Sequence, residues 1–320
     1  WRMDAMTNGM KLLDLGQTAI NIGDVGFSVG TYDNLGTDKF QGNVGLNSNH
    51  FGLLNGTVNF SGPITKKGLK FSLGAYVNYD PGTYKVSKND IDRYYNDQTQ
   101  LYKAALTQDY KFEGGQGYTS AFYKYANSKS MTMQQYAPYK YSLDGSVTEL
   151  DGFKIGSDSY LASQKFIVRD AQTGELAERD AIDDYGSESH TLDIISKNTL
   201  DNGLNLNMVA RYHTAKSGLY LPIMTGVNEA GDSQGVMILA SKKTPIKSLT
   251  TLFEVGKKSG RHDWRIGFNQ WLYDVDKFTT EGILYNQTVE SNPKVISGSE
   301  VYGAINEYHK GTKNKTALNI

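Results

Sequence analysis

The sequence predicts an all-β protein, an antiparallel up-and-down transmembrane β-barrel that is part of a larger barrel. Three observations predict it: strand-like runs with alternating polarity, short turns that alternate with long polar connections, and no long apolar helix. In residues 69–79 the odd positions are apolar or aromatic, and the even positions are mostly small, polar or charged. Successive strand side chains point to opposite faces, so one face is apolar and the other polar. Strands of about ten residues with this alternation are typical of outer-membrane barrels.

Composition narrows the function classes. The chain has 320 residues, a formal net charge of -1, 34 glycines, 22 tyrosines and no cysteine. Without cysteine there are no disulfides and no thiolate metal sites. A net charge near zero with no basic cluster gives no reason to expect a nucleic-acid partner. No apolar run of about 18 residues is present, so no helix is expected to span a membrane.

The predicted elements follow in chain order. Residues 1–37 are expected to be the end of a plug domain or a junction segment, with a short helix over 10–15 and a short strand over 23–29. Residues 38–320 are predicted to be the N-terminal part of the barrel, with long extracellular loops. Its strands are expected near 40–48, 53–62, 69–79, 100–112, 117–126, 188–199, 204–214, 247–257, 263–273 and 299–308, with a last one starting near 315.

The connections support this architecture more strongly than the strand ends do. Short, Gly-bearing turns are predicted at 63–68, 113–117, 201–203, 258–261 and 310–314. Long connections are predicted at 80–99, 127–187, 215–246 and 274–298. In outer-membrane barrels short turns face the periplasm and long loops face outside. A Greek-key sandwich does not predict this strict alternation.

The sequence carries no sign of catalysis. None of the five histidines stands at metal-ligand spacing from another, and no cysteine is present to complete a site. Phosphate-loop and dinucleotide fingerprints are missing. We therefore predict a protein that is not an enzyme and that has no cofactor, no catalytic residue and no metal site.

Two sets of residues are candidates for function. Four polar residues fall on the polar face of predicted strands, where they are expected to line the lumen or contact a plug: Lys70, Arg211, Arg265 and Asn269. Four tyrosines are the candidates for ligand binding by the long loops. Three lie in the 127–187 connection, Tyr136, Tyr139 and Tyr141, and Tyr220 lies in residues 218–222, which are expected to form a second rim of the barrel mouth. Aromatic side chains supply large contact area with little conformational entropy to lose. Packing of one loop on another is an equal alternative for these tyrosines.

Two stretches resemble a known family. The run Gly62-Pro63-Ile64-Thr65-Lys66-Lys67-Gly68-Leu69-Lys70-Phe71, followed by Asn78-Tyr79-Asp80-Pro81-Gly82-Thr83-Tyr84, resembles the early barrel of TonB-dependent outer-membrane receptors of Bacteroidota. The hairpin over 256–273 resembles their later hairpins. The resemblance implies a barrel of about 22 strands with an N-terminal plug that imports a bulky ligand. No TonB-contacting box and no plug motif is recognisable in the sequence itself.

The resemblance also implies a location and partners. The location is the bacterial outer membrane, and the partners are its lipid, a plug domain of the same polypeptide, a TonB-type energy-transducing protein and a surface lipoprotein. The ligand is expected to be a metal chelate, a glycan or a peptide. The chain is expected to be an internal piece of a longer protein. Two alternatives stay open: a passive porin with the same strand rhythm, and a surface adhesin or structural β-protein.

Overall fold

The chain is almost entirely antiparallel β-structure. The computed structural model describes residues 7–22, 26–82, 97–129, 139–151, 154–155, 162–170, 173–276, 278–290, 293–306 and 309–319. Strands make up 73% of it and helix 3%. The predicted all-β class is therefore confirmed, and the main sheet is an open part of a barrel.

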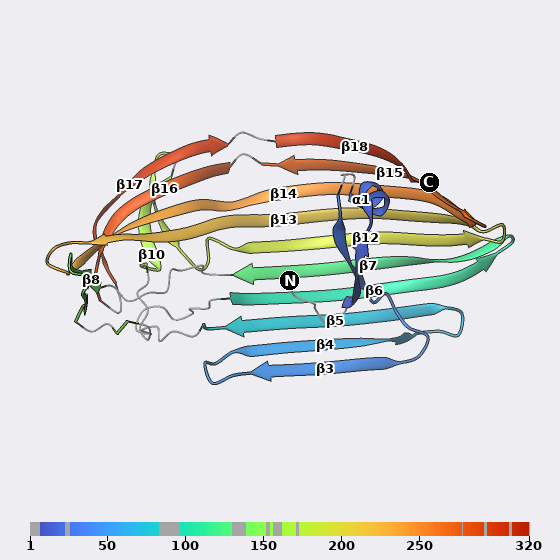
Figure 1. Cartoon of the computed structure of the whole chain (residues 1–320), viewed down its shortest axis with the longest axis horizontal. Helices are drawn as coiled ribbons and strands as arrows, with labels where there is room; N and C mark the ends of the chain where they lie inside the picture. Colours follow the sequence, from blue (N-terminus) through green and yellow to red (C-terminus); the bar gives the residue numbers. More distant parts are fainter. Residues whose placement is uncertain are drawn as a thin grey trace.

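A single curved sheet of twelve strands dominates the described chain (Figure 1). Strands follow one another along it as antiparallel hairpins, and both β15 and β16 pair with the long β14. Likewise β17 pairs with β16 and β18 with β15, so these four segments make up two long, interrupted strands. The strands are β3 (Gln41–Ser48), β4 (Leu54–Pro63), β5 (Leu69–Asp80), β6 (Asp97–Phe112), β7 (Gly115–Lys129), β12 (Ser187–Leu200), β13 (Leu204–Val227), β14 (Ser233–Ser259), β15 (His262–Val275), β16 (Phe278–Thr288), β17 (Val295–Asn306) and β18 (His309–Asn319).

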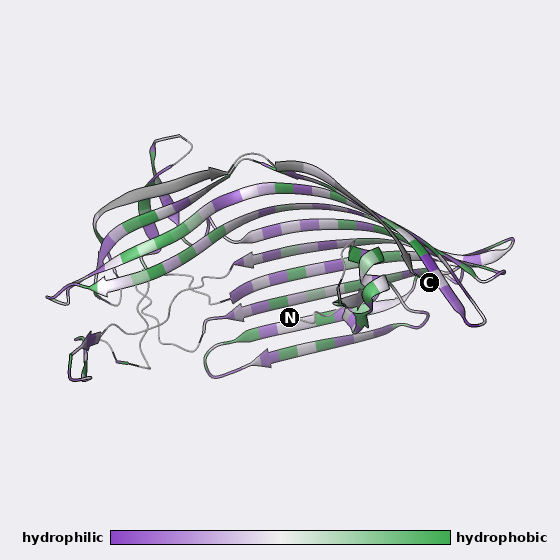
Figure 2. Ribbon diagram, turned by 45° about the horizontal axis from the view of Figure 1, so that its top comes forward, coloured by the Kyte–Doolittle hydropathy of each residue, from purple (hydrophilic) through white to green (hydrophobic). Residues whose placement is uncertain are grey.

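The N-terminal segment lies on the concave face of this sheet (Figures 1 and 2). It consists of β1 (Thr7–Leu13), α1 (Leu15–Ile22) and β2 (Ser28–Asp33). The predicted helix over 10–15 is wrong, because residues up to Leu13 pair with β2. The helix begins after Asp14, whose Oδ1 accepts a 2.7 Å hydrogen bond from the Gln17 amide as an N-cap. Of the predicted strand over 23–29, residues 23–25 lie outside the described chain.

Alternation separates the two faces of the sheet as the sequence indicates. In β5 the side chains of Lys70, Ser72 and Asn78 face the concave side, and Ser72 is fully buried. Leu73, on the opposite face, is 51% exposed. The register continues this outer face across neighbouring strands through Tyr123, Leu192 and Tyr212. The outer face is therefore apolar and uncovered over the half of the sheet nearest the short turns. We call this the lower half and the half toward the long connections the upper half.

Two of the predicted long connections are wrong. Residues 215–246 and 274–298 are mostly strand, because β13 and β14 run for 24 and 27 residues and β16 and β17 extend beside them. What remains between β13 and β14 is a five-residue turn in which Asn228 Oδ1 accepts the Asp232 amide at 3.0 Å. Sequence reasoning stopped these strands early because their polar alternation loses contrast beyond Tyr212.

The predicted turn at 310–314 is also wrong, since these residues lie inside β18 and pair with β15. Its Gly, Lys and Asn residues are typical of turns, but the free edge of β15 supplies the backbone hydrogen bonds of a strand. Gly311 has a packing reason instead of a turn: a Cβ at this position would overlap Tyr273 Oη.

A bulge in β14, within its hairpin with β13, reverses the face to which each side chain of β14 points. From Ser217 to Leu219 the pairing advances two residues along β13 and three along β14, from Thr244 to Ser241. One extra residue in one strand shifts its side chains to the other face. Gly218 allows the close approach, because a Cβ there would lie 2.8 Å from the Ser241 carbonyl oxygen. Above the bulge, even-numbered residues of β14 therefore join the outer face.

The 127–187 connection contains two small hairpins. They are β8 (Tyr139–Tyr141) with β9 (Val147–Glu149), and β10 (Lys165–Arg169) with β11 (Leu176–Asp180). The second hairpin covers the upper outer face of β13, β14 and β16 and forms the main apolar cluster with them. Within the described residues no helix is long and apolar enough to cross a membrane.

Candidate functional site

A linker over residues 33–38 is fixed to the concave face by three strands. Lys103 of β6 forms an ion pair with Asp33 at 2.6 Å. Asn34 donates a 3.0 Å hydrogen bond to Ser61 of β4, and Thr107 of β6 donates a 2.6 Å hydrogen bond to the Leu35 carbonyl. The end of the N-terminal segment is thus held against the first barrel strands by both charge and hydrogen bonds.

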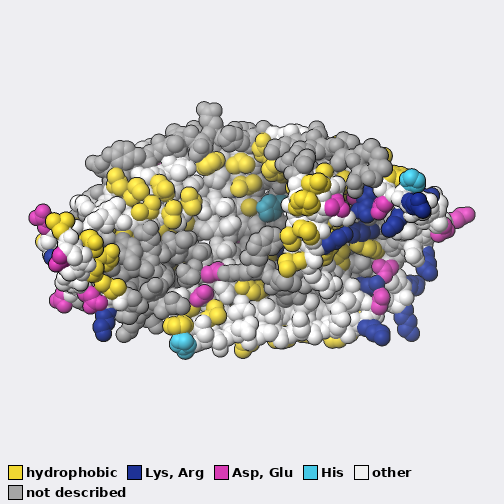
Figure 3. All heavy atoms as spheres, viewed as in Figure 1, with side chains coloured by type: hydrophobic (Ala, Val, Ile, Leu, Met, Phe, Trp, Pro, Cys, Tyr) yellow, Lys and Arg dark blue, Asp and Glu magenta, His cyan; other side chains and the backbone are white. Residues whose placement is uncertain are grey.

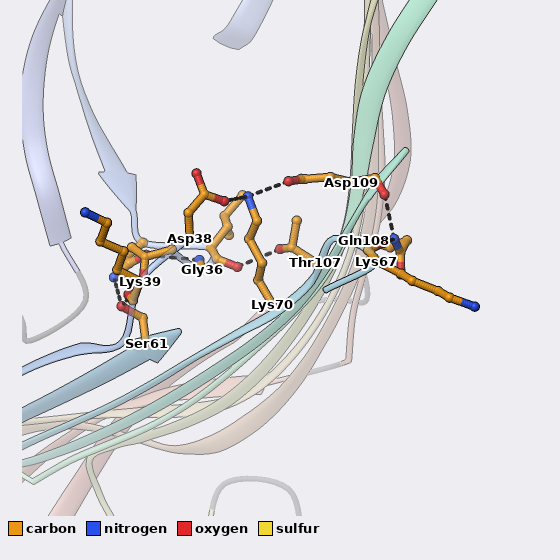
Figure 4. A network of polar contacts seen from close by, with 12 residues as sticks. Gly36, Asp38, Lys39, Ser61, Lys67, Lys70, Thr107, Gln108 and Asp109 are labelled. Atoms are coloured by element: carbon orange, nitrogen blue, oxygen red, sulfur yellow. Dashed lines mark hydrogen bonds and ion pairs between the residues drawn. The ribbon is translucent and has the colours of Figure 1, made fainter. Parts of the chain in front are cut away.

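Lys70 is the central cation of this anchor. Its Nζ lies between the carboxylates of Asp38, at 2.7 Å, and of Asp109 on β6, as Figure 4 shows. Gly36 packs directly over the Lys70 side chain: its φ is +132°, and a Cβ would lie 2.8 Å from Lys70 Cβ. The close approach and the backbone conformation both require glycine here.

The helix α1 forms a second anchor several strands away. Asn269 of β15 donates a 3.1 Å hydrogen bond to the carbonyl oxygen of Asn21 in α1. Ile20 is 1% exposed, and a Cβ on Gly267 would lie 2.5 Å from its Cγ2. This anchor is mainly apolar, whereas the linker anchor is ionic. Together the two anchors hold the N-terminal segment across the concave face.

The two arginines among the predicted inward residues also face the concave side. Arg211 of β13 makes two parallel hydrogen bonds to Asp193 of β12, at 2.8 and 2.7 Å. Arg265 of β15 lies 3.7 Å from Asp263 on the same strand. Of the four predicted inward residues, Lys70 and Asn269 touch the N-terminal segment, whereas the two arginines have their carboxylate partners on the wall.

The predicted ligand-binding tyrosines are not brought together. Tyr139 and Tyr141 lie on β8 and are exposed. Tyr220 does not lie in a loop; it belongs to β13 and is 5% exposed inside the apolar cluster, stacked against Phe166 of β10. It lies on the same outer face as Tyr212, and it is buried because the β10–β11 hairpin covers this part of β13. Tyr136 lies outside the described residues.

Sequence reasoning missed the polar network that fastens the β10–β11 hairpin. Asp170 pairs with Arg179 at 2.7 Å, and both side chains are buried. Lys242, at the bulge in β14, also pairs with Asp170. Beside them, burial raises the pKa of the Tyr185 hydroxyl well above its ordinary value. The apolar, β-branched run over 166–168 and the glycine at 174 are the sequence signal that identifies this hairpin.

The described polar groups of the concave face position the N-terminal segment and one another through ion pairs and hydrogen bonds. Among the residues that the structure describes, no group of three or more His, Asp or Glu side chains is arranged to hold a metal ion. The carboxylates of the linker anchor are already paired with lysines. Chemically, the arrangement holds a polypeptide segment inside a polar, charged half-barrel.

Comparison with solved structures identifies the fold. The chain aligns over 98% of its length with the pyoverdine receptor FpvA of Pseudomonas aeruginosa in complex with a heterologous pyoverdine, at a TM-score of 0.55 and 11% identity. The ferripyoverdine receptor of the outer membrane of P. aeruginosa gives a TM-score of 0.52, and the complex of FpvAI with pyocin S2 gives 0.53, both at 11% identity and 98% coverage. The chain has the fold of part of a TonB-dependent receptor barrel.

The likeness extends over only part of these neighbours. The chain covers 38% of the first and 44% of the other two, so it spans about two fifths of a receptor's length. No protein-family model and no curated protein matches the sequence. A likeness at 11% identity shows the fold and not the ligand.

Proposed function

We propose that this chain is part of an outer-membrane receptor that imports a bulky ligand by TonB-dependent transport. The observation that supports it best is the N-terminal segment anchored on the concave face of a receptor-type sheet. A segment anchored inside the barrel is expected of a plugged receptor rather than of an open porin. The proposal includes the bacterial outer membrane, a plug or junction segment to which residues up to 37 belong, and a TonB-type energy-transducing partner.

The anchors divide the roles of the concave face. Lys70 with Lys103 fixes the linker, and Asn269 fixes the helix of the plug. Arg211 and Arg265 line the lumen beside them. The chain is a transporter and not an enzyme, and its own residues need no cofactor.

Ligand recognition is assigned to the long connection above the sheet. Tyr139 and Tyr141 are exposed there, and Tyr136 precedes them in the same connection. A metal chelate, a glycan or a peptide fits aromatic contacts of this kind. Tyr220 packs the hairpin in place and is not offered to a ligand. A surface lipoprotein as a further partner, and the Bacteroidota type of receptor, remain sequence-based predictions.

The test is energy-dependent uptake by cells that express the full-length protein. Growth on a panel of ferric chelates, oligosaccharides and peptides is compared with and without the TonB-type protein. Uptake that needs both proteins supports the proposal, and equal uptake without the TonB-type protein indicates a passive porin. The double variant Tyr139→Ala/Tyr141→Ala is expected to reduce uptake, whereas the control Tyr212→Ala, on the outer face, is expected to leave it unchanged.

A further inference from the structure

The short-turn end of the concave face contains a basic hollow. Its volume is about 1060 Å³, and seven of its lining residues are Lys or Arg against three that are Asp or Glu. Lysine and arginine side chains gather at this end of the molecule in Figure 3. A hollow of this size is that of a pocket for a whole small-molecule ligand rather than for a single ion.

The acidic residues of the hollow are already occupied. Asp109 pairs with Lys70, and Glu254 accepts a 2.7 Å hydrogen bond from Asn207. Asp263 lies 3.7 Å from Arg265. Six lysines of the lining have no carboxylate within ion-pair distance among the described residues: Lys66, Lys67, Lys111, Lys197, Lys257 and Lys258.

The strand register aims several of these cations into the hollow. In the strand register, Lys197 of β12 lies opposite Asn207 of β13, and Asn207 lies opposite Glu254 of β14. All three side chains therefore point to the concave face. Lys258 lies on the same face, four residues beyond Glu254. Charges of one sign on a curved, low-dielectric wall focus the field and raise the local concentration of the opposite ion.

The N-terminal segment borders the hollow without filling it. Its linker anchor involves Asp109 on one rim, and Asn269 lies on the strand of Arg265 on the other. None of the lining residues belongs to the described part of that segment. Neutral hydrogen-bonding groups complete the lining, among them Tyr110, Asn198 and Asn205.

We propose that this hollow is a binding site for an anionic solute, and that the imported ligand carries negative charge. A ligand passing the N-terminal segment meets the hollow at the end of the sheet where the short turns lie. The second half of the proposal rests on the receptor function proposed above. The anion site itself does not, and it is tested without transport.

The test uses the purified full-length protein in detergent with inorganic pyrophosphate as probe. Isothermal titration calorimetry at low ionic strength compares wild type with Lys197→Gln/Lys258→Gln. The double variant is expected to bind at least about tenfold more weakly, since each unit charge in contact with a multivalent anion is worth several-fold in affinity even in water. Binding by wild type is expected to weaken as salt rises.

Two matched variants separate charge from damage. Lys216→Gln/Lys247→Gln removes the same charge from exposed positions on the outer face and is expected to bind as wild type does. Lys197→Arg/Lys258→Arg keeps the charge and is expected to retain binding. Circular dichroism checks that each variant keeps its β-structure.

Absence of pyrophosphate binding to wild type, or equal weakening in both glutamine variants, overturns the anion site. If wild type does not bind and Lys197→Gln/Lys258→Gln makes the N-terminal segment protease-sensitive, the hollow seats an acidic polypeptide instead. Transport without anion binding refutes only this inference, and anion binding without energy-dependent uptake refutes only the receptor function.

Discussion

The outer face of the sheet has an uncovered half and a covered half built from similar residues. In the lower half, Met208, Phe253 and Phe268 form one row across three strands and are 39–47% exposed. In the upper half, Ile238 and Ile283 face each other on neighbouring strands and are fully buried beneath the β10–β11 hairpin. Similar apolar residues on one face of the sheet therefore meet two different environments.

The difference shows that polarity alternation alone does not tell whether lipid or protein covers an apolar face. Strand length does. A strand tilted in a bilayer needs about 9–11 residues to cross it. The 24 residues of β13 exceed this by a wide margin, so its upper half needs another apolar cover. The chain supplies that cover itself from the 127–187 connection.

The largest expected effect is a charge placed in the covered half. Ile238→Arg is expected to lower the free energy of unfolding by more than about 4 kcal/mol, because an unpaired charge would be buried under the hairpin. Urea unfolding of the full-length protein, in detergent and in lipid, measures it. The loss is expected to be the same in both. A loss below about 1 kcal/mol would mean that the hairpin does not cover this face.

The ion pair that fastens the hairpin comes next. Arg179→Ala leaves the buried Asp170 carboxylate with one cation fewer and is expected to cost about 3–5 kcal/mol. Release of the hairpin is read as faster proteolysis between residues 162 and 185. The control Lys165→Ala removes an exposed pair with Glu178, 3.5 Å long, which is worth about 0–1 kcal/mol. Equal proteolysis of the two variants would contradict the fastening role.

A charge in the uncovered half is expected to cost less, and only in lipid. Met208→Arg is expected to destabilise the protein by about 2–4 kcal/mol in a bilayer, as for arginine at the midplane of a barrel. The control is Asn205→Arg, at an exposed position near the short turn of the same strand, and it is expected to change the stability little. Unfolding from vesicles and from mild detergent gives the comparison. A cost that is independent of lipid would place protein, not bilayer, over Met208.

The smallest effect is expected on the solvent side of the hairpin. Leu176→Asp alters an exposed residue of β11 and is expected to change stability by less than about 0.5 kcal/mol. A larger loss would show that a further part of the protein packs on the hairpin.

The architecture was predictable because its signals are local. Period-2 alternation in β5 depends on residues a few positions apart, and it fixed both the strand and the side on which Lys70 lies. The glycine-bearing turn at 201–203 likewise identified the hairpin of β12 and β13. Where the alternation loses contrast, as in β16 with Glu281 on the same face as Ile283 and Tyr285, the strand exists because β14 pairs with it.

The site was predictable only in part, since its contacts are distant in sequence. Lys103 and Asp33 lie 70 residues apart, and nothing near either one indicates the other. Tyr220 reads as a loop tyrosine, and only the three-dimensional structure shows that β13 continues through it and that the β10–β11 hairpin covers it. The period-2 pattern thus predicts the face of the sheet on which a side chain lies, but only the three-dimensional structure shows which residue it contacts.

Spin labels on the full-length protein in a bilayer show whether the lower outer face lies in lipid. The chain has no cysteine, so each cysteine substitution places one label at one known position in it. Met208→Cys, Phe253→Cys and Phe268→Cys are compared with Leu176→Cys on the hairpin. Labels at the first three positions are expected to collide with dissolved oxygen far more often than with a water-soluble nickel chelate, and the label at 176 is expected to show the reverse. Frequent collisions with the nickel chelate at all four positions would contradict it.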